Sequence, residues 1–529
     1  MLNTPRARRG MVTSPHHLAS EAGLRILREG GDAIEATIAM GAALAVVYPH
    51  MTAIGGDGFW LVSRDGAEPV AVDACGAAAA AATVDHYRRA GHAAIPWRGP
   101  LAANTVAGAV SGWGEAFALS REYGGRLPMS RLLEDAVWSA ENGFHVTASQ
   151  HELTAAKRAE LIDAPGFAAA FLAGGGAPST ASLMKLPALA RTLRRIGEEG
   201  AESFYRGELA RQIAADLARI GAPVAGADLA AHRATRRAPL STGVRGARLF
   251  NFPPPTQGVA SLMILALFDR LGVREAEGFA HIHGLVEATK QAFLVRDRHV
   301  GDPSRMSVDV QSLLEAATLD RLAARIDRER ALEWPQPANP GDTVWLGAID
   351  GKGLAVSYIQ SIYFEYGSGC VLEESGFVWQ NRGASFRLDG DGPRALAPGR
   401  KPFHTLNPAM ALFDDGRVMS YGTMGGEGQP QTQSAVFSRY GMFGQDLQQA
   451  ITAPRWLLGK TWGENSVTLK LESRFDAALV EAMRRAGHEI ELLPDFTSTM
   501  GHAGALVRHG GGLIEGAADP RSDGAAIGF

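Results

Sequence analysis

The chain has 529 residues, of which 46% are hydrophobic and 20% are charged, a balance typical of globular proteins with a substantial core. The net charge of −4 and the lack of a basic tract argue against nucleic acid as a partner. No apolar run approaches the roughly 20 residues that a membrane-spanning helix needs. The two cysteines, Cys75 and Cys370, exclude a disulfide framework, so we expect a cytoplasmic protein.

The first part of the chain has helical patterns. Residues 17–47 predict two helices, and Asp32 is a suitable cap for the second. The Gly-rich segment 54–58 follows, but its glycine spacing is not that of a phosphate loop, so we expect a tight turn or close backbone packing there. A further helix is predicted to begin at Ser130 and to end at Gly143.

The pattern changes near residue 343. It is mostly helical from residue 130 to about residue 330, whereas short strand-like runs separated by Gly turns dominate afterwards. These later runs are VSYIQS, GFVWQN, PAMALF, RVMSYG and AGALVRH. A sheet that takes strands from both parts of the chain, with helices on both faces, accounts for this distribution.

The segment DTVWLGAIDGKGLAVSYIQS, residues 342–361, predicts a β-hairpin that a Pro-rich stretch, residues 335–341, leads into. If Lys352 is the centre of the hairpin, Thr343 faces Ser361. Directly opposed residues of an antiparallel pair have Cβ atoms roughly 5 Å apart, so two hydroxyls would meet at the mouth of the hairpin. The pattern alone favours an ordinary hairpin that happens to carry hydroxyl residues at its ends.

Several motifs occur in a fixed order along the whole chain. The early run SPHHLASEAGLRILREGGDAIEATIAMGAALAVVYPHMTAIGGDGFWLV and the terminal ADPRSDGAAIGF enclose DTVWLGAID, FEYGSGCVL, PFHTLNPAM, GTMGGEG and APRWLLG. In this order they resemble the γ-glutamyltranspeptidase family over essentially the full length. The resemblance implies an α+β fold, the four-layer αββα sandwich of the N-terminal-nucleophile (Ntn) hydrolases.

The resemblance also implies that the chain processes itself. Members of the family are made as an inactive single chain that cuts itself before a Thr, and that residue matches Thr343. Cleavage between Asp342 and Thr343 would give a helix-rich large chain, 1–342, and a strand-rich small chain, 343–529, in one intertwined domain. A Thr hydroxyl needs a base to become a good nucleophile. The α-amine of an N-terminal Thr, with a pKa of about 7.7–8.0, suits that role near neutral pH.

Three further residues match the catalytic machinery of the family. Ser361 matches the second hydroxyl residue, which bonds to the nucleophile. Gly425 and Gly426 match the glycine pair whose backbone N–H groups form the oxyanion hole, where a side chain would block close approach. Without the resemblance, a plain turn explains the two glycines equally well. No metal or organic cofactor is expected.

Both charged anchors for a γ-glutamyl group are missing from the matched positions. The Arg expected two residues after Asp73 is Cys75, and the expected Asp matches Ser385. A buried carboxylate or ammonium without a partner costs several kcal/mol. We therefore expect γ-glutamyl compounds to be poor substrates.

The same matching places Arg382, His404 and Thr405 in the substrate pocket, with Ser385 beside them and Tyr363 narrowing it. Arg382 offers a bidentate fork for a carboxylate, and His404 can donate to the same group. A surface ion pair for Arg382 and a backbone hydrogen bond for His404 are the structural alternatives. Within the family, the resemblance of these segments implies a small amide that carries a carboxylate, and the charge pattern is compatible with oxamate, a primary amide attached directly to a carboxylate.

Three alternatives stay open at this point. The first is a γ-glutamyltransferase or glutathione hydrolase with rearranged anchors, and the second is a cephalosporin or glutaryl acylase. The third is a binding protein that kept the fold and lost catalysis. The expected partners are a small-molecule amide and the two chains of one precursor, with assembly into a homo-oligomer left open.

Overall fold

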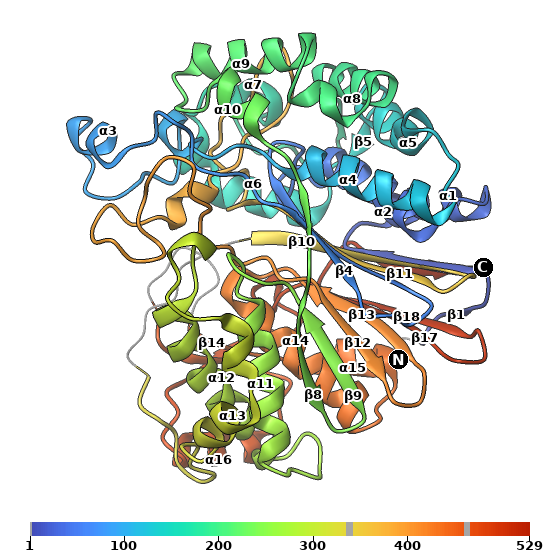
Figure 1. Cartoon of the computed structure of the whole chain (residues 1–529), viewed down its shortest axis with the longest axis vertical. Helices are drawn as coiled ribbons and strands as arrows, with labels where there is room; N and C mark the ends of the chain where they lie inside the picture. Colours follow the sequence, from blue (N-terminus) through green and yellow to red (C-terminus); the bar gives the residue numbers. More distant parts are fainter. Residues whose placement is uncertain (1–2, 335–341, 460–465) are drawn as a thin grey trace.

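A computed structural model describes residues 3–334, 342–459 and 466–529. In these ranges two seven-stranded antiparallel sheets lie face to face in the middle of the molecule (Figure 1). The first sheet has the strand order β19-β2-β10-β11-β3-β4-β7. Its strands are β2 (Gly10–Ser14), β3 (Asp57–Arg64), β4 (Val70–Ala74), β7 (Thr235–Arg237), β10 (Asp342–Asp350), β11 (Leu354–Tyr363) and β19 (Ala525–Gly528).

The second sheet has the order β1-β18-β17-β13-β12-β9-β8. Its strands are β1 (Arg6–Ala7), β8 (Leu240–Val244), β9 (Ala247–Asn251), β12 (Ala409–Phe413), β13 (Val418–Thr423), β17 (Ala503–Arg508) and β18 (Ile514–Ala518). Each sheet therefore contains strands from both sides of residue 342, and neither part of the chain completes a sheet by itself.

Helices cover the outer face of each sheet (Figure 1). The first sheet is covered by α1 (His17–Arg28), α2 (Ala33–Val47) and α4 (Ala109–Tyr123), with α5 (Met129–Asn142) and α8 (Pro187–Glu199) outside them. The second sheet is covered by α11 (Gly258–Arg270), α14 (Gln429–Phe437) and α15 (Leu447–Thr452), with α12 (Phe279–His299) and α13 (Ala316–Ala323) packed on α11. This arrangement confirms the predicted four-layer αββα sandwich.

The remaining α-helices and strands of the described ranges lie outside the two seven-stranded sheets. The helices are α3 (Val84–Arg89), α6 (Ala148–Leu161), α7 (Phe167–Phe171), α9 (Glu208–Ile220), α10 (Gly226–Ala231) and α16 (Ala477–Arg485). The strands are β5 (Phe144–His145), β6 (Leu183–Met184), β14 (Trp456–Leu458), β15 (Leu469–Glu472) and β16 (Ile490–Leu493). Throughout the described ranges, no helix is both long enough and apolar enough to cross a membrane.

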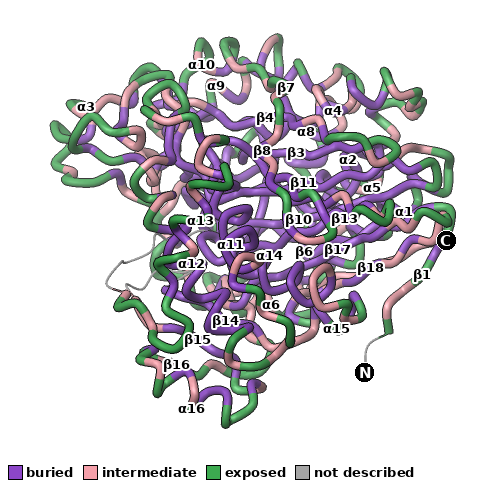
Figure 2. Tube along the Cα trace, turned by 60° about the horizontal axis from the view of Figure 1, so that its bottom comes forward, coloured by how far each residue is buried: buried purple, intermediate pink, exposed green. Residues whose placement is uncertain are grey.

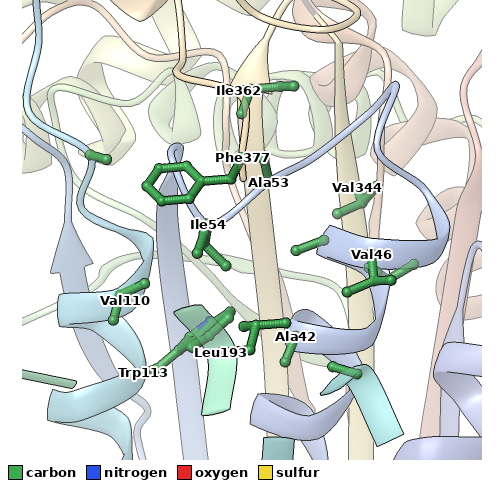
Figure 3. Packing of buried hydrophobic residues seen from close by; sticks show 14 of the residues in the cluster. Ala42, Val46, Ala53, Ile54, Val110, Trp113, Leu193, Val344, Ile362 and Phe377 are labelled. Atoms are coloured by element: carbon green, nitrogen blue, oxygen red, sulfur yellow. The ribbon is translucent and has the colours of Figure 1, made fainter. Parts of the chain in front are cut away.

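Buried residues are concentrated along the central strands and the helices that cover them, as the purple part of the tube shows (Figure 2). Because successive side chains of a strand point to opposite faces, β10 contributes to two layers. Val344 packs in the cluster formed with the helices, near Val46 of α2 (Figure 3), whereas Trp345 packs in the cluster between the sheets. Residues of odd number in β10 and β11 therefore face the second sheet.

Local predictions at the start of the chain fare unevenly. The two helices over 17–47 are confirmed as α1 and α2, and Asp32 caps α2 in a capping box with Glu35. The prediction that Ser130 heads the next helix is wrong. The helix α5 begins at Met129, because Pro128 readily takes the extended N-cap conformation (φ −70°, ψ 154°), while Gly143 ends the helix as predicted.

The run GFVWQN does not form the strand that its composition predicts. Its backbone makes only isolated bridges, from Val378 to Val371 and from Trp379 to Gly55. Its backbone N–H groups form hydrogen bonds with loop carbonyls instead of with a neighbouring strand. Trp379 N donates to Cys370 O, and Gln380 N donates to Gly55 O. The Pro-rich approach to the hairpin, residues 335–341, lies outside the described residues.

Candidate active site

The hairpin of β10 and β11 has the predicted register over most of its length. Val344 pairs with Gln360 and Ile349 with Ala355, as a turn centred on Lys352 requires. The register then shifts between Val344 and Asp342, so that Asp342 lies opposite Tyr363. Thr343 therefore lies at an irregularity at the mouth of the hairpin, and the regular ladder ends one residue before the predicted Thr343–Ser361 pair.

The hydroxyl of Thr343 accepts a hydrogen bond from a residue of the second sheet's helix layer. Gln429, the first residue of α14, donates from Nε2 to Thr343 Oγ1 at 3.2 Å. The backbone N–H and the Nδ2 of Asn407 both donate to Gln429 Oε1, at 3.2 and 3.1 Å. These two bonds fix the amide so that its NH₂ group, and not its oxygen, faces Thr343.

Replacing Gln429 with leucine is expected to lower kcat by about 10-fold with little change in KM, because one hydrogen bond that orients the Thr343 hydroxyl is lost. Steady-state kinetics measures both constants. Gln431→Leu is the matched control, since Gln431 is buried on the same helix but bonds to the backbone of Leu458. An equal fall of kcat in both variants would contradict the role of Gln429.

Gly425 and Gly426 lie where β13 ends and α14 approaches. Both have left-handed backbone conformations, with φ of 118° and 51°, which glycine adopts without strain. The side chain of Gln257 donates from Nε2 to Gly426 O and to Thr405 O, both at 2.8 Å. Arg296 in turn donates to Gln257 Oε1 at 2.9 Å. The glycine turn and the segment that carries Thr405 are thus held together.

Ser361 lies in β11, between β10, which carries Thr343, and β3. It is buried, and its Oγ accepts the backbone N–H of Tyr363 at 2.8 Å. On its other side it pairs directly with Asp57, the first residue of β3. Directly opposed side chains of an antiparallel pair lie on one face, so Asp57 and Ser361 both face the second sheet. Gly56 permits this approach, because a Cβ there would lie 2.1 Å from Ser361 O.

Arg382 is completely buried and opens the short 3₁₀ turn Arg382–Ser385. Its guanidinium lies 3.7 Å from the centre of the Tyr363 ring, and Nη1 donates to Thr405 Oγ1 at 3.2 Å. Tyr363 holds a left-handed backbone (φ 82°) directly opposite Asp342. Burial lowers the pKa of Arg382 to about 10, so it is cationic at neutral pH.

The other two donor groups of Arg382, Nε and Nη2, are buried and have no hydrogen-bond partner in the described part of the chain. These two N–H groups point the same way and form the fork that binds a carboxylate side-on. Three other buried arginines use this fork on a carboxylate: Arg296 on Asp297, Arg439 on Glu277 and Arg521 on Glu472. The fork of Arg382 is therefore suited to a carboxylate that comes from outside the chain, and the surface ion pair considered above is wrong.

His404 is completely buried beside this arginine. Its Nε2 lies 3.1 Å from Asp57 Oδ2, and its ring lies edge-on to Phe59, with the ring centres 4.7 Å apart. Burial, and then the cations Arg382 and Lys401, hold the pKa of His404 well below its usual value. His404 is therefore a neutral imidazole hydrogen-bonded to the Asp57 carboxyl group, and within the described ranges its side chain makes no hydrogen bond to backbone.

Ser385 is only half-buried, and its hydroxyl donates to Phe403 O at 2.9 Å. It therefore fixes the turn after Arg382 to the segment before His404. At the other matched position, burial raises the pKa of the Cys75 thiol well above its usual value. Neither residue supplies a charge, as expected if both anchors for a γ-glutamyl group are missing.

Two buried groups of described residues have ligand-type atoms close enough to surround a metal ion. In the group of Asp57, Cys75 and His404, a proton already joins the aspartate to the histidine, and the thiol is not ionised. In the group of His283, Glu287 and His488, the two histidines bond to each other at 2.9 Å, and Lys290 donates to Glu287 at 2.7 Å. In both groups the atoms that face one another are already joined by hydrogen bonds within the protein, so we assign neither group to a metal.

Comparison with known proteins identifies the family of the chain. Residues 19–529 match the family model described as Gamma-glutamyltranspeptidase. The chain belongs to the γ-glutamyltranspeptidase family. This member of the family is 55% identical over 521 residues to the oxamate amidohydrolase proenzyme of Klebsiella pneumoniae subsp. pneumoniae, with 98% of each chain covered. It is 40% identical over 524 residues to the glutathione hydrolase-like YwrD proenzyme of Bacillus subtilis, again with 98% of each covered.

A solved structure shows the same fold. The cephalosporin acylase from Bacillus halodurans matches with a TM-score of 0.92 and 33% identity, over 100% of this chain and 97% of that one. The resemblance seen in the motifs is therefore confirmed, and the protein is an Ntn amidohydrolase of the γ-glutamyltranspeptidase family.

Three residues of the site were not predicted from the sequence: Asp57, Asn407 and Gln429. The Gly-rich segment 54–58 was expected only to pack closely, which Gly55 and Gly56 confirm. The sequence offered one signal for Asp57: it is an acidic residue between glycines, directly before an apolar strand. A carboxylate in that position is expected to be buried, and a buried carboxylate needs hydrogen-bond partners.

Proposed function

We propose that this member of the family is a self-processing amidase that hydrolyses a small amide bearing a carboxylate, and that oxamate is the substrate that fits best. The observation that carries this proposal is the buried Nε–Nη2 fork of Arg382, which has no partner among the described residues and lies over Tyr363, opposite Asp342 at the start of β10. The relative named oxamate amidohydrolase proenzyme supports it as well.

In the proposed maturation, the chain cuts itself between Asp342 and Thr343 and leaves a large chain, 1–342, and a small chain, 343–529. The two chains stay together because each sheet contains strands from both. The cut converts the backbone nitrogen of Thr343 into an α-amine, which is the general base that an internal Thr lacks.

In the proposed reaction, Thr343 Oγ1 attacks the amide carbon while its α-amine takes the hydroxyl proton. Backbone N–H groups of Gly425 and Gly426 stabilise the oxyanion, and Ser361 and Gln429 orient the hydroxyl. The C–N bond then breaks, and the α-ammonium group returns the proton to the leaving nitrogen, which departs as ammonia. Water, deprotonated by the same amine, hydrolyses the acyl ester and releases oxalate with a free Thr343.

Arg382 binds the substrate carboxylate in this scheme, and a cation–π contact with the Tyr363 ring fixes the position of the guanidinium group. A charge-assisted bidentate pair combines energy with orientation. The positions of the missing γ-glutamyl anchors support a substrate without an α-amine, since Cys75 is an uncharged thiol and the Ser385 hydroxyl is bound to backbone.

Ammonia release from oxamate, measured beside nitroaniline release from γ-glutamyl-p-nitroanilide, tests the proposal. We expect kcat/KM to favour oxamate by at least about 100-fold, because a substrate whose charged groups lack partners loses several kcal/mol. A preference for the γ-glutamyl compound would point to a glutathione hydrolase, and a preference for a glutaryl amide would point to an acylase. Either preference would refute the proposed substrate.

A further inference from the structure

The pair of Asp57 and His404 lies next to the proposed reaction centre. Asp57 is directly opposite Ser361, which lies in the strand that pairs with the nucleophile's strand. Thr405, the residue after His404, accepts the hydrogen bond from Arg382 Nη1. Neighbouring strands are about 4.8 Å apart, so the pair lies within about two strand spacings of Thr343.

The protein fixes the orientation of the Asp57 carboxylate. Its Oδ1 accepts three hydrogen bonds, from Gly76 N at 3.0 Å, Gly108 N at 3.1 Å and Gln380 Nε2 at 3.1 Å. Its Oδ2 is left to face His404 Nε2 at 3.1 Å. At pH 8.5, above the pKa of about 7 to which burial raises it, Asp57 is an ionised carboxylate that only accepts, so this contact requires a proton on His404 Nε2.

The other ring nitrogen then follows by elimination. His404 is neutral because burial and the nearby Arg382 and Lys401 keep its pKa well below the usual value. A neutral imidazole with its proton on Nε2 has a lone pair on Nδ1, so Nδ1 is an acceptor. This Nδ1 is buried and has no hydrogen-bond partner among the residues that the structure describes.

A buried acceptor without a donor is costly, so the group that completes this site must bring an N–H or O–H to Nδ1. A carboxylate cannot do so at neutral pH. The expectation that His404 donates to the substrate carboxylate therefore conflicts with this tautomer. Two sets of buried atoms thus have no partner among the described residues: the donors Nε and Nη2 of Arg382 and the acceptor Nδ1 of His404. One small molecule that carries a carboxylate and an N–H donor would satisfy both.

We propose that His404 Nδ1 accepts a hydrogen bond from the amide N–H of the substrate, and that Asp57 positions His404 by fixing its tautomer. The proposal rests on the proposed amidase function and narrows its substrate class. Arg382 and His404 together select a carboxylate with an adjacent amide that retains N–H. Esters and fully N-substituted amides of the same acid lack the donor and are discriminated against.

The variant Asp57→Asn reverses the tautomer without changing the size of the side chain. The three N–H donors on Oδ1 require the Asn oxygen in that place, so the Asn NH₂ faces His404 and donates to Nε2. The imidazole proton must then move to Nδ1, which turns the acceptor into a donor. The variant should therefore impair substrates that have an amide N–H and should not impair substrates that lack one.

The experiment compares oxamate with monomethyl oxalate, which has the same carboxylate and acyl carbon but no N–H. At pH 8.5, we expect Asp57→Asn to lower kcat/KM for oxamate about 10- to 100-fold and to leave the ester unchanged or improved. In the variant, His404 Nδ1–H would face the amide N–H of oxamate, and these two donors repel each other. In the ester, it would face the alkoxy oxygen, which can accept a hydrogen bond. The buried Asp216, which binds Ser375, gives the matched control Asp216→Asn, for which the amide-to-ester ratio should not change.

A direct readout of the tautomer accompanies the kinetics. In protein labelled with nitrogen-15 histidine, the His404 Nδ1 resonance should be of the unprotonated type in the unmutated protein and of the protonated type in Asp57→Asn. The assignment comes from the signals that disappear in His404→Phe. A merely structural role for Asp57 would lower both activities together without moving this resonance.

The outcomes separate the two proposals. An active enzyme whose amide-to-ester ratio is the same in Asp57→Asn, or whose Nδ1 is already protonated at pH 8.5, overturns the role of His404 and leaves the amidase function standing. An unmutated enzyme that hydrolyses neither oxamate nor its ester overturns the proposed function and this inference with it. The pH is chosen because burial raises the pKa of Asp57 to about 7, and Asp57 must be ionised.

Discussion

A Thr343→Ala variant is expected to remain a single 56 kDa chain and to lose at least about 10⁴-fold of the amidase activity. The substitution removes the hydroxyl that accepts the hydrogen bond from Gln429, and with it the proposed nucleophile of self-cleavage and of amide hydrolysis. The strand β10 and its packing do not depend on that hydroxyl, because Val344 and Trp345 hold the strand in two apolar layers. Gel electrophoresis and ammonia release measure the two effects.

The variant Thr343→Ser is the matched control. Serine keeps the hydroxyl and, after cleavage, the α-amine, so processing and part of the activity should persist. If Thr343→Ala were cut at the same bond, or if it retained activity comparable to that of the serine variant, Thr343 would not be the nucleophile.

The second large effect is expected for Arg382→Met. Removal of the carboxylate fork should raise KM for oxamate by about 100-fold, which corresponds to about 3 kcal/mol, within the range measured for charge-assisted pairs. The neutral diamide oxamide, which has no carboxylate, should show a far smaller effect. The variant should also keep or raise the melting temperature of the ligand-free protein, because a buried cation with an unsatisfied fork is replaced by an apolar side chain.

Two further variants check that interpretation. Arg439→Met removes a buried arginine whose fork binds Glu277, so it should lower the melting temperature and leave KM for oxamate unchanged. Arg382→Lys keeps the charge but not the fork, and should recover little of the affinity. Equal effects of Arg382→Met on oxamate and oxamide would remove Arg382 from the carboxylate site.

The parts of this structure that follow from local rules were predictable. Alternation of apolar residues and the Gly turn around Lys352 determine the register of the hairpin, which the structure reproduces from Val344 to Ile349. Cap chemistry at Asp32 and the left-handed Gly143 determine two helix ends. These signals act within a few residues, and a single sequence contains them in full.

The contacts that complete the site join segments far apart in the chain. Asp57 reaches His404 across 347 positions, and Gln429 reaches Thr343 across 86. Neither pairing follows from periodicity or spacing, because it depends on how two sheets and their connecting loops stack. The irregularity at Thr343 was also unpredictable, since a hairpin rule assumes that the ladder continues to its end.

The terminal motif ADPRSDGAAIGF illustrates a different limit. It is one of the motifs that resemble the family, yet in the structure it forms ion pairs and a strand and contains none of the proposed catalytic residues. Asp519 and Arg521 join Arg455 and Glu472 in a buried ion network, and β19 adds the last strand to the first sheet beside β2. A recognisable motif can therefore mark how the sandwich is closed rather than where the chemistry takes place.

Intact-mass spectrometry of the purified, unmutated protein tests the central claim most directly. Self-processing predicts two species that account for the whole chain, one ending at Asp342 and the other spanning residues 343–529 with a free N-terminal Thr343. A single species of 56 kDa in a preparation that releases ammonia from oxamate would contradict the claim, because an internal Thr343 has no α-amine to act as its base.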